Sequence, residues 1–131
     1  MTARGAAKKV PFAFVLDELE ALAPTTRPMF GCTAVYVGPR IVLILRDGRG
    51  ADDDGVWIAT TADHHASLRA ELPSMRSIRV FGPGESGWQV IPAEADAFEE
   101  EVLRVCELVR RADPRVGKVP RPKRRRRSAP A

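Results

Sequence analysis

Cysteines are few in this sequence, and long apolar runs are absent. The two cysteines, Cys32 and Cys106, lie far apart, and neither belongs to a CxxC or Cys/His cluster. This spacing argues against a disulfide framework and a zinc site, so we expect reduced thiols in a cytoplasmic protein. No stretch approaches the roughly 18 consecutive apolar residues of a membrane helix, and residues 1–10 lack the apolar core of a secretory signal. We therefore expect no contact with a membrane.

The short motifs that carry most enzyme chemistry are also missing. The sequence contains no phosphate-binding loop, no GxSxG and no pair of carboxylates with a recognisable catalytic partner. The segment 82–85, Gly-Pro-Gly-Glu, has the composition of a turn rather than of a dinucleotide fingerprint. These absences favour a protein that is not an enzyme and that has no cofactor.

Acidic residues are absent from the C-terminal segment. Residues 114–131 contain eight Lys or Arg and no acid, whereas residues 1–113 contain the other 13 basic residues and all 17 acidic ones. The overall charge of +4 therefore divides into a body near −4 and a tail of +8. This separation is typical of an acidic domain with a cationic appendage. We expect a flexible basic arm over residues 1–10, one folded domain over 11–113 and a disordered Arg-rich tail over 114–131.

The tail is the main candidate binding element. A run of arginines displaces counterions from phosphate groups, and this attraction weakens as the salt concentration rises. Sequence-specific recognition would need a folded element that reaches base edges, and Pro120, Pro122 and Pro130 prevent a long helix here. Three interpretations stay open: nonspecific contact with nucleic acid or ribosomes, docking on an acidic protein, and a solvated extension that keeps the domain soluble. The residues that would carry binding are Arg121, Lys123, Arg124, Arg125, Arg126 and Arg127.

The composition of the body is that of one globular domain. The chain of 131 residues is 44% apolar and 29% charged, which leaves room for a single core. Arginine outnumbers lysine 17 to 4, a usage typical of a GC-rich bacterial genome. An open sheet would also offer an edge strand for a homodimer.

Hydrophobic spacing in the body predicts three helices and five short strands. We expect helices at residues 11–23, 60–73 and 95–113, and strands at residues 29–37, 41–45, 56–58, 77–81 and 87–91. The last helix has the most regular helical spacing, from Phe98 to Val109. Strands grouped before and after one helix and joined by short turns favour an α+β fold with a mainly antiparallel sheet, in the order α-β-β-β-α-β-β-α.

Two short segments resemble a known family. Residues 27–31, Arg-Pro-Met-Phe-Gly, followed by Tyr36, a glycine turn and an apolar strand, resemble the opening of the TfoX N-terminal domain. Residues 87–92, Gly-Trp-Gln-Val-Ile-Pro, resemble its last hairpin before an acidic helix, and the similarity extends over roughly residues 12–112. The resemblance implies a small α+β domain related to YjbR-like proteins, in which residues 29–31 are structural. It also implies a regulatory role, because full-length TfoX, also called Sxy, regulates bacterial competence genes as a protein partner of transcription factors.

The histidines and the acidic loop are weaker candidates for a site. His64 and His65 are adjacent, so on a helix their side chains diverge by about 100° and cannot share a metal. The acidic run Asp52, Asp53 and Asp54 lies in a glycine-rich segment and predicts a solvated turn. The alternative is a hard-cation site in this oxygen-rich loop, although the spaced ligands of a calcium loop are missing.

The thiols and the tryptophans are expected to be part of the core. Cys106 lies on the apolar face of the last predicted helix, and Cys32 is expected to be a buried strand thiol rather than a reactive one. Trp57 and Trp88 lie in predicted strands, where packing is the favoured role and a stacking platform for bases is the alternative.

Together these features favour a non-catalytic domain that binds a macromolecule, with the basic tail supplying electrostatic contact with nucleic acid or an acidic partner. The alternative is a small enzyme, or a protein that binds a metal or ligand, with a cleft near residues 52–65.

Overall fold

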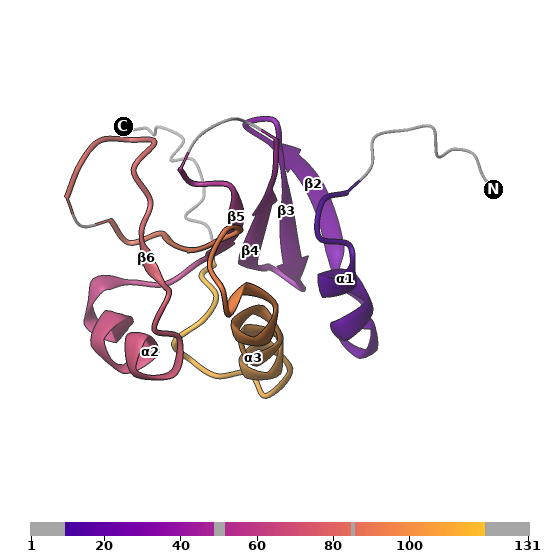
Figure 1. Cartoon of the computed structure of the whole chain (residues 1–131). Coiled ribbons are helices and arrows are strands. Elements are labelled where there is room, and N and C mark those ends of the chain that lie inside the picture. Colours follow the sequence, from indigo (N-terminus) through magenta and orange to yellow (C-terminus); the bar gives the residue numbers. More distant parts are fainter. Residues whose placement is uncertain (1–9, 49–51, 85, 120–131) are drawn as a thin grey trace, which may run out of the picture.

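The protein has an antiparallel sheet with helices on one side of it (Figure 1). The computed structural model describes residues 10–48, 52–84 and 86–119. Within these residues the sheet has six strands in the order β2-β3-β4-β5-β7-β6. The strands are β2 (Thr25–Met29), β3 (Cys32–Val37), β4 (Arg40–Arg46), β5 (Gly55–Ile58), β6 (Arg76–Ser77) and β7 (Gln89–Pro92). The helices are α1 (Phe14–Glu18), α2 (His65–Glu71) and α3 (Phe98–Arg110), with 3-10 turns at Glu20–Leu22 and Ala62–His64.

The predicted α+β class and antiparallel sheet are confirmed, with one additional strand. The expected strand at residues 29–37 is two strands, because Phe30 and Gly31 turn the chain back between β2 and β3. Both turn residues have positive φ, 54° and 78°, as a two-residue hairpin turn requires. β2 is an edge strand of the sheet and therefore tolerates Pro28, which lacks a backbone N–H.

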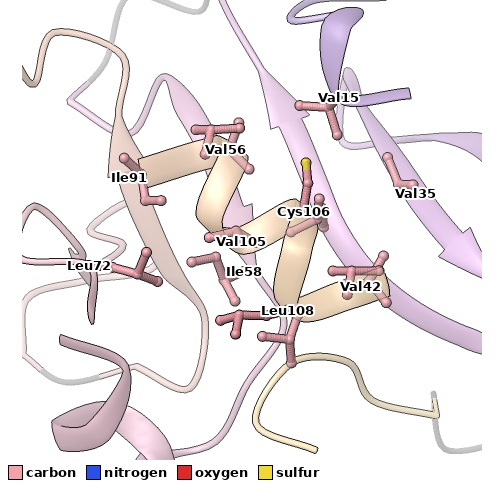
Figure 2. Packing of buried hydrophobic residues seen from close by; sticks show 14 of the residues in the cluster. Val15, Val35, Val42, Val56, Ile58, Leu72, Ile91, Val105, Cys106 and Leu108 are labelled. Carbon is pink, nitrogen blue, oxygen red and sulfur yellow. The ribbon is translucent and has the colours of Figure 1, made fainter. Parts of the chain in front are cut away.

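The main hydrophobic core lies between the helices and one face of the sheet. Aliphatic residues of β4, β5 and β7 pack there against all three helices (Figure 2). From α3 the buried residues include Val102, Val105, Cys106 and Leu108. The amphipathic spacing of α3 creates this arrangement, because its apolar positions fall on one side of the helix. Burial of these side chains is the dominant contribution to folding.

A second, smaller cluster covers the opposite face of the sheet. Its buried members come from the strands, from Ala59 just after β5 and from Ile78 just after β6, and none of them belongs to a described helix. Tyr36 of β3 and Trp57 of β5 are its buried aromatic residues, and Met29 and Trp88 pack at its edge. This sheet face is therefore covered by side chains and by the segment after β6, without a helix among the described residues.

The hairpin predicted from residues 77–81 and 87–91 is present but shorter than expected. Ser77 pairs with Gln89, and Arg76 pairs with Val90. The prediction of a strand continuing to Phe81 is wrong, because the backbone N–H groups of Arg79 and Val80 donate to the side chain of Asp53 instead of to a neighbouring strand.

The folded part also extends past the boundary expected at residue 113. Val116 is buried in the main core, the Gly117 N–H donates to the carbonyl of Ala59 at 2.7 Å, and Lys118 pairs with Ile41 of β4. Arg115 is ion-paired with Asp113 and Glu71. Residues 114–119 thus belong to the packed body and not to the tail. The predicted arm at residues 1–9 and the rest of the predicted tail, 120–131, lie outside the described residues.

In the part of the chain that the structure describes, no helix is both long enough and apolar enough to cross a membrane.

Candidate functional site: an aromatic groove on the second sheet face

An apolar groove of about 400 Å³ opens on the sheet face that carries no helix in the described structure. Its volume lies within the usual range of ligand-binding pockets. Among the described residues, Lys118 is the one charged residue in its lining, and no acid lines it. The lining residues are Met29, Phe30, Tyr36, Ile41, Ile44, Trp57, Phe81, Trp88, Lys118 and Val119.

Four aromatic rings form a continuous row along the groove. The ring centroids of Phe30 and Phe81 are 6.2 Å apart, those of Phe81 and Trp57 are 6.4 Å apart, and those of Trp57 and Trp88 are 6.0 Å apart. The first two contacts are edge-to-face, a favourable arrangement for aromatic pairs. Trp57 is buried, whereas Phe30 is 72% exposed and Phe81 is 68% exposed. The row therefore runs from half-buried Trp88 through buried Trp57 to two solvent-facing rings.

The turn between β2 and β3 places the Phe30 ring. At φ 54° a residue other than Gly, Asn or Asp is unfavourable, so the backbone of Phe30 is held by the hairpin and not by its own preference. The Cys32 thiol donates to the Phe30 carbonyl at 3.6 Å across this turn. The phenyl ring at this strained turn position contacts Phe81 and stays largely exposed.

Asp53 holds the segment that carries Phe81. The carboxylate of Asp53 is 1% exposed and accepts hydrogen bonds from the backbone N–H groups of Arg79 at 2.7 Å and Val80 at 2.8 Å, and from the Arg76 guanidinium at 3.0 Å. Burial by itself raises the pKa of Asp53, but these hydrogen bonds and the charge of Arg76 outweigh it, so the pKa is lowered. The expectation that Asp53 lies in a solvated turn is wrong, because its carboxylate is a buried anchor. Phe81 follows directly after the two anchored residues.

Two arginines add positive charge to the aromatic face. The guanidinium of Arg27 lies 4.9 Å from the ring centroid of Tyr36, and that of Arg46 lies 5.7 Å from the ring centroid of Trp57. Both are cation–π contacts. Nη1 of Arg46 is buried and lies 4.0 Å from a carboxylate oxygen of Asp53, and it has no hydrogen-bond partner among the described residues.

A basic pocket lies beside the segment that bears Phe81. It has a volume of about 650 Å³ and is lined by Arg69, Arg76, Ser77, Arg79, Gly82, Pro83 and Gly84. Arg69 is oriented by the side-chain oxygen of Gln89 at 3.0 Å. Arg79 pairs with Asp52 at 3.0 Å, but both side chains are more than half exposed, so this ion pair is weak and can be exchanged. Residues 79–84 therefore border an aromatic groove at Phe81 and a cationic pocket at Arg79.

The histidines do not form a site with the acidic loop. The His65 side chain is buried, with Nε2 3.4 Å from the carbonyl oxygen of Gly87, whereas His64 is half-buried. Among residues 10–48, 52–84 and 86–119, no group of three or more His, Cys, Asp or Glu side chains is arranged to hold a metal ion. The alternative hypothesis expected a cleft near residues 52–65. From this segment, Trp57 lines the aromatic groove.

The cysteines are buried in the two different clusters, and neither forms a disulfide. Burial raises the pKa of the Cys106 thiol to about 12, which suppresses its thiolate. The buried placement expected for both cysteines is confirmed. The packing role expected for Trp57 and Trp88 is also confirmed, and both tryptophans line the groove as well.

The six basic residues expected to carry binding, from Arg121 to Arg127, lie outside the described residues. The described chain ends at Val119, which lines the groove together with Lys118. The described chain therefore ends in the groove lining, and the basic residues follow it in the sequence.

Comparison with models of protein families, with curated proteins and with solved structures gives no match for this chain.

The sequence pattern drew attention to the tryptophans and missed the phenylalanines. Phe30 was assigned a structural role in the Met-Phe-Gly segment, and Phe81 was assigned to a strand. The available signal was the glycine that directly follows each of them, because glycine is typical of turns.

Proposed function

We propose that this protein is a non-catalytic nucleic-acid-binding domain that attracts its ligand through the basic segment after residue 119. The observation that carries the proposal is that Lys118 and Val119, the last described residues, line an aromatic groove whose described lining contains no acid. The segment itself contains six Lys or Arg and no acid. Such an array neutralises phosphates and gives binding that is independent of base sequence.

The charge balance of the body supports the same proposal. Arg115, which the sequence assigned to the tail, is held by Asp113 and Glu71, and these contacts raise its pKa. Its charge is therefore used within the fold, and the proposal assigns contact with an external partner to the cations from Arg121 onward.

The cellular setting is part of the proposal. Two buried cysteines that form no disulfide fit a reducing compartment, so we place the protein in the cytoplasm of a bacterial cell. The regulatory role implied by the resemblance to the TfoX N-terminal domain would be exerted there, through contact with a nucleic acid or with a nucleic-acid-bound partner.

A titration at several salt concentrations tests the proposal. The probe is a fluorescein-labelled 20-base-pair duplex, and the proteins are the full-length chain and the full-length variant K123Q/R124Q/R125Q/R126Q/R127Q. We expect the wild type to bind and the variant to bind at least about tenfold more weakly at low salt. The slope of log affinity against log salt should become shallower by about 0.9 for each phosphate that the tail no longer neutralises.

The matched control is R104Q/R110Q/R111Q, which removes arginines from α3 and its C-terminus. It should bind the duplex nearly as the wild type does, because these residues do not line the groove. Equal affinity of the wild type and the tail variant would refute the proposal. Binding of the wild type to polyglutamate but not to the duplex would replace it with the acidic-protein alternative.

A further inference from the structure

We propose that the aromatic groove stacks the unpaired bases of a single-stranded nucleic acid, with Phe30 and Phe81 as the stacking rings. This inference rests on the proposed function and adds a specific ligand class to it. It depends on the described groove and not on the conformation of the tail.

The exposed apolar residues of the described chain are concentrated at this groove. Large hydrophobic side chains are exposed at Phe30, Val80, Phe81, Leu103 and Val119, and of these Phe30, Phe81 and Val119 line the groove while Val80 adjoins Phe81. Only Leu103 lies elsewhere, on α3. Such a concentration of exposed apolar surface is characteristic of a binding site.

The structure also fixes the rings in place. Phe81 follows two backbone N–H groups held by the buried carboxylate of Asp53, and Phe30 occupies a hairpin turn. Each ring contacts the other, and Phe81 also contacts Trp57. Rings that are pre-ordered in this way lose little conformational entropy when a ligand stacks on them.

The shape and chemistry of the groove favour unpaired bases. Bases stack readily on exposed aromatic side chains, and stacking tolerates any sequence because every base has a π face. A duplex hides these faces inside its own stack, so it offers the groove only its backbone and base edges. A volume of about 400 Å³ with apolar walls at Ile41 and Ile44 accommodates flat, uncharged ring systems.

The surrounding charge selects a polyanion over other occupants. Lys118 lines the groove, and Arg27 lies against the ring of Tyr36. These cations would repel the basic tail of the same chain. They complement a ligand that alternates flat rings with phosphates, which an acidic peptide does not do.

The experiment compares single-stranded with double-stranded probes. Full-length protein is titrated into fluorescein-labelled 20-nucleotide oligothymidine and into a 20-base-pair duplex. The variant is F30N/F81A, in which Asn tolerates the left-handed backbone at position 30. The wild type should bind the single strand more tightly than the duplex. The variant should lose on the order of tenfold or more in affinity for the single strand and less than about twofold for the duplex.

Two control variants separate stacking from general apolar contact. L103A removes an exposed apolar side chain from α3 and should leave both affinities unchanged. F81W keeps a ring at position 81 and should retain single-strand affinity, whereas F81L keeps apolar volume without a ring and should not. Circular dichroism and a thermal melt verify that every variant is folded.

The outcomes distinguish this inference from the proposed function. If the variant K123Q/R124Q/R125Q/R126Q/R127Q loses binding but F30N/F81A binds oligothymidine as the wild type does, the stacking inference is wrong and the proposed function stands. If the wild type binds neither probe, both are wrong. If light scattering shows a wild-type dimer that F30N/F81A dissociates, without a loss of single-strand affinity, the groove is a self-interface and the stacking inference is overturned.

Discussion

The two faces of the sheet differ in what covers them and in the side chains they use. One face packs aliphatic residues against three helices, and its largest side chains are fully buried. The other face uses aromatic rings and arginines, and its row of rings extends from a buried Trp57 to an exposed Phe81. The helical face is organised for stability, because its central side chains are fully buried. The aromatic face buries part of its surface and keeps the rest open, as a binding surface must.

The largest effect is expected on the helical face. Leu108→Ala removes a fully buried side chain from α3, so the free energy of unfolding should fall by about 3 to 5 kcal/mol through lost transfer energy and a new cavity. Urea denaturation of the full-length protein measures this loss. Leu103→Ala, at a 40% exposed position on the same helix, is the control and should lose less than about 1 kcal/mol. Similar losses at both positions would contradict the assignment of this face as the core.

A somewhat smaller loss is expected at the anchor of the aromatic face. Asp53→Asn should lower the free energy of unfolding by about 2 to 4 kcal/mol, because it removes the charge that compensates Arg46 and Arg76. The variant should also bind oligothymidine more weakly, since Phe81 loses its anchored neighbours. Asp52→Asn, in an exposed ion pair with Arg79, should change stability by at most about 1 kcal/mol. If Asp53→Asn is as stable as the wild type, the anchor does not contribute to this face.

The ion pair between Asp113 and Arg115, in the C-terminal segment, should make the free energy of unfolding depend on pH. Hydrogen bonds from the Arg115 guanidinium and then from its backbone N–H hold the pKa of Asp113 at about 2, below its ordinary value of 3.8. The native state therefore binds fewer protons than the unfolded state. The contribution of Asp113 is complete above about pH 4 and is lost as the pH falls through 2.

Urea denaturation at pH 5 and pH 2.5 measures this dependence. The wild type should lose more stability between the two pH values than Asp113→Asn, which has no carboxyl to protonate. Glu94→Gln, at an exposed position, serves as the control and should follow the wild type. Parallel losses in the wild type and Asp113→Asn would show that the Arg115 contact adds nothing in solution.

The smallest effect on the free energy of unfolding is expected at Phe81, one of the two proposed stacking rings. Phe81→Ala removes a ring that is 68% exposed and makes edge-to-face contacts with Phe30 and Trp57, so the loss should be below about 1 kcal/mol. The same urea denaturation measures it. A loss comparable to that of Leu108→Ala would mean that Phe81 is a core residue, and the contrast between the two faces would fail.

The helical face could be predicted from the sequence more fully than the aromatic face. Helical spacing from Phe98 to Val109 and the apolar run at residues 41–45 are local signals, and both became the expected elements, α3 and β4. β2 was not expected, because it is mostly exposed and contains Pro28, so it has neither apolar alternation nor a typical strand composition. The fold class did not depend on it.

The aromatic face depends on partners that are distant in sequence. Three consecutive aspartates in a glycine-rich loop indicate a solvated turn, and only the folded chain brings Arg76, Arg79 and Val80 to Asp53. The exposure of Phe30 and Phe81 follows from turns whose backbone angles local composition does not specify. The C-terminal boundary of the folded domain was placed too early, because Arg115 and Lys118 belong to a basic run in the sequence. In the fold, Arg115 is ion-paired with Glu71 and Lys118 pairs with Ile41.

The two ends of the sheet determine how copies of this protein can associate. A strand added beside β2 would meet a five-residue element that contains Pro28, and a strand added beside β6 would meet only two residues. Edge strands that are short or contain proline disfavour the pairing of sheets from two molecules, and therefore also aggregation through sheet edges. Any homodimer is therefore expected to form through side-chain surfaces and to leave the hydrogen-bonded ladder of each subunit as it is.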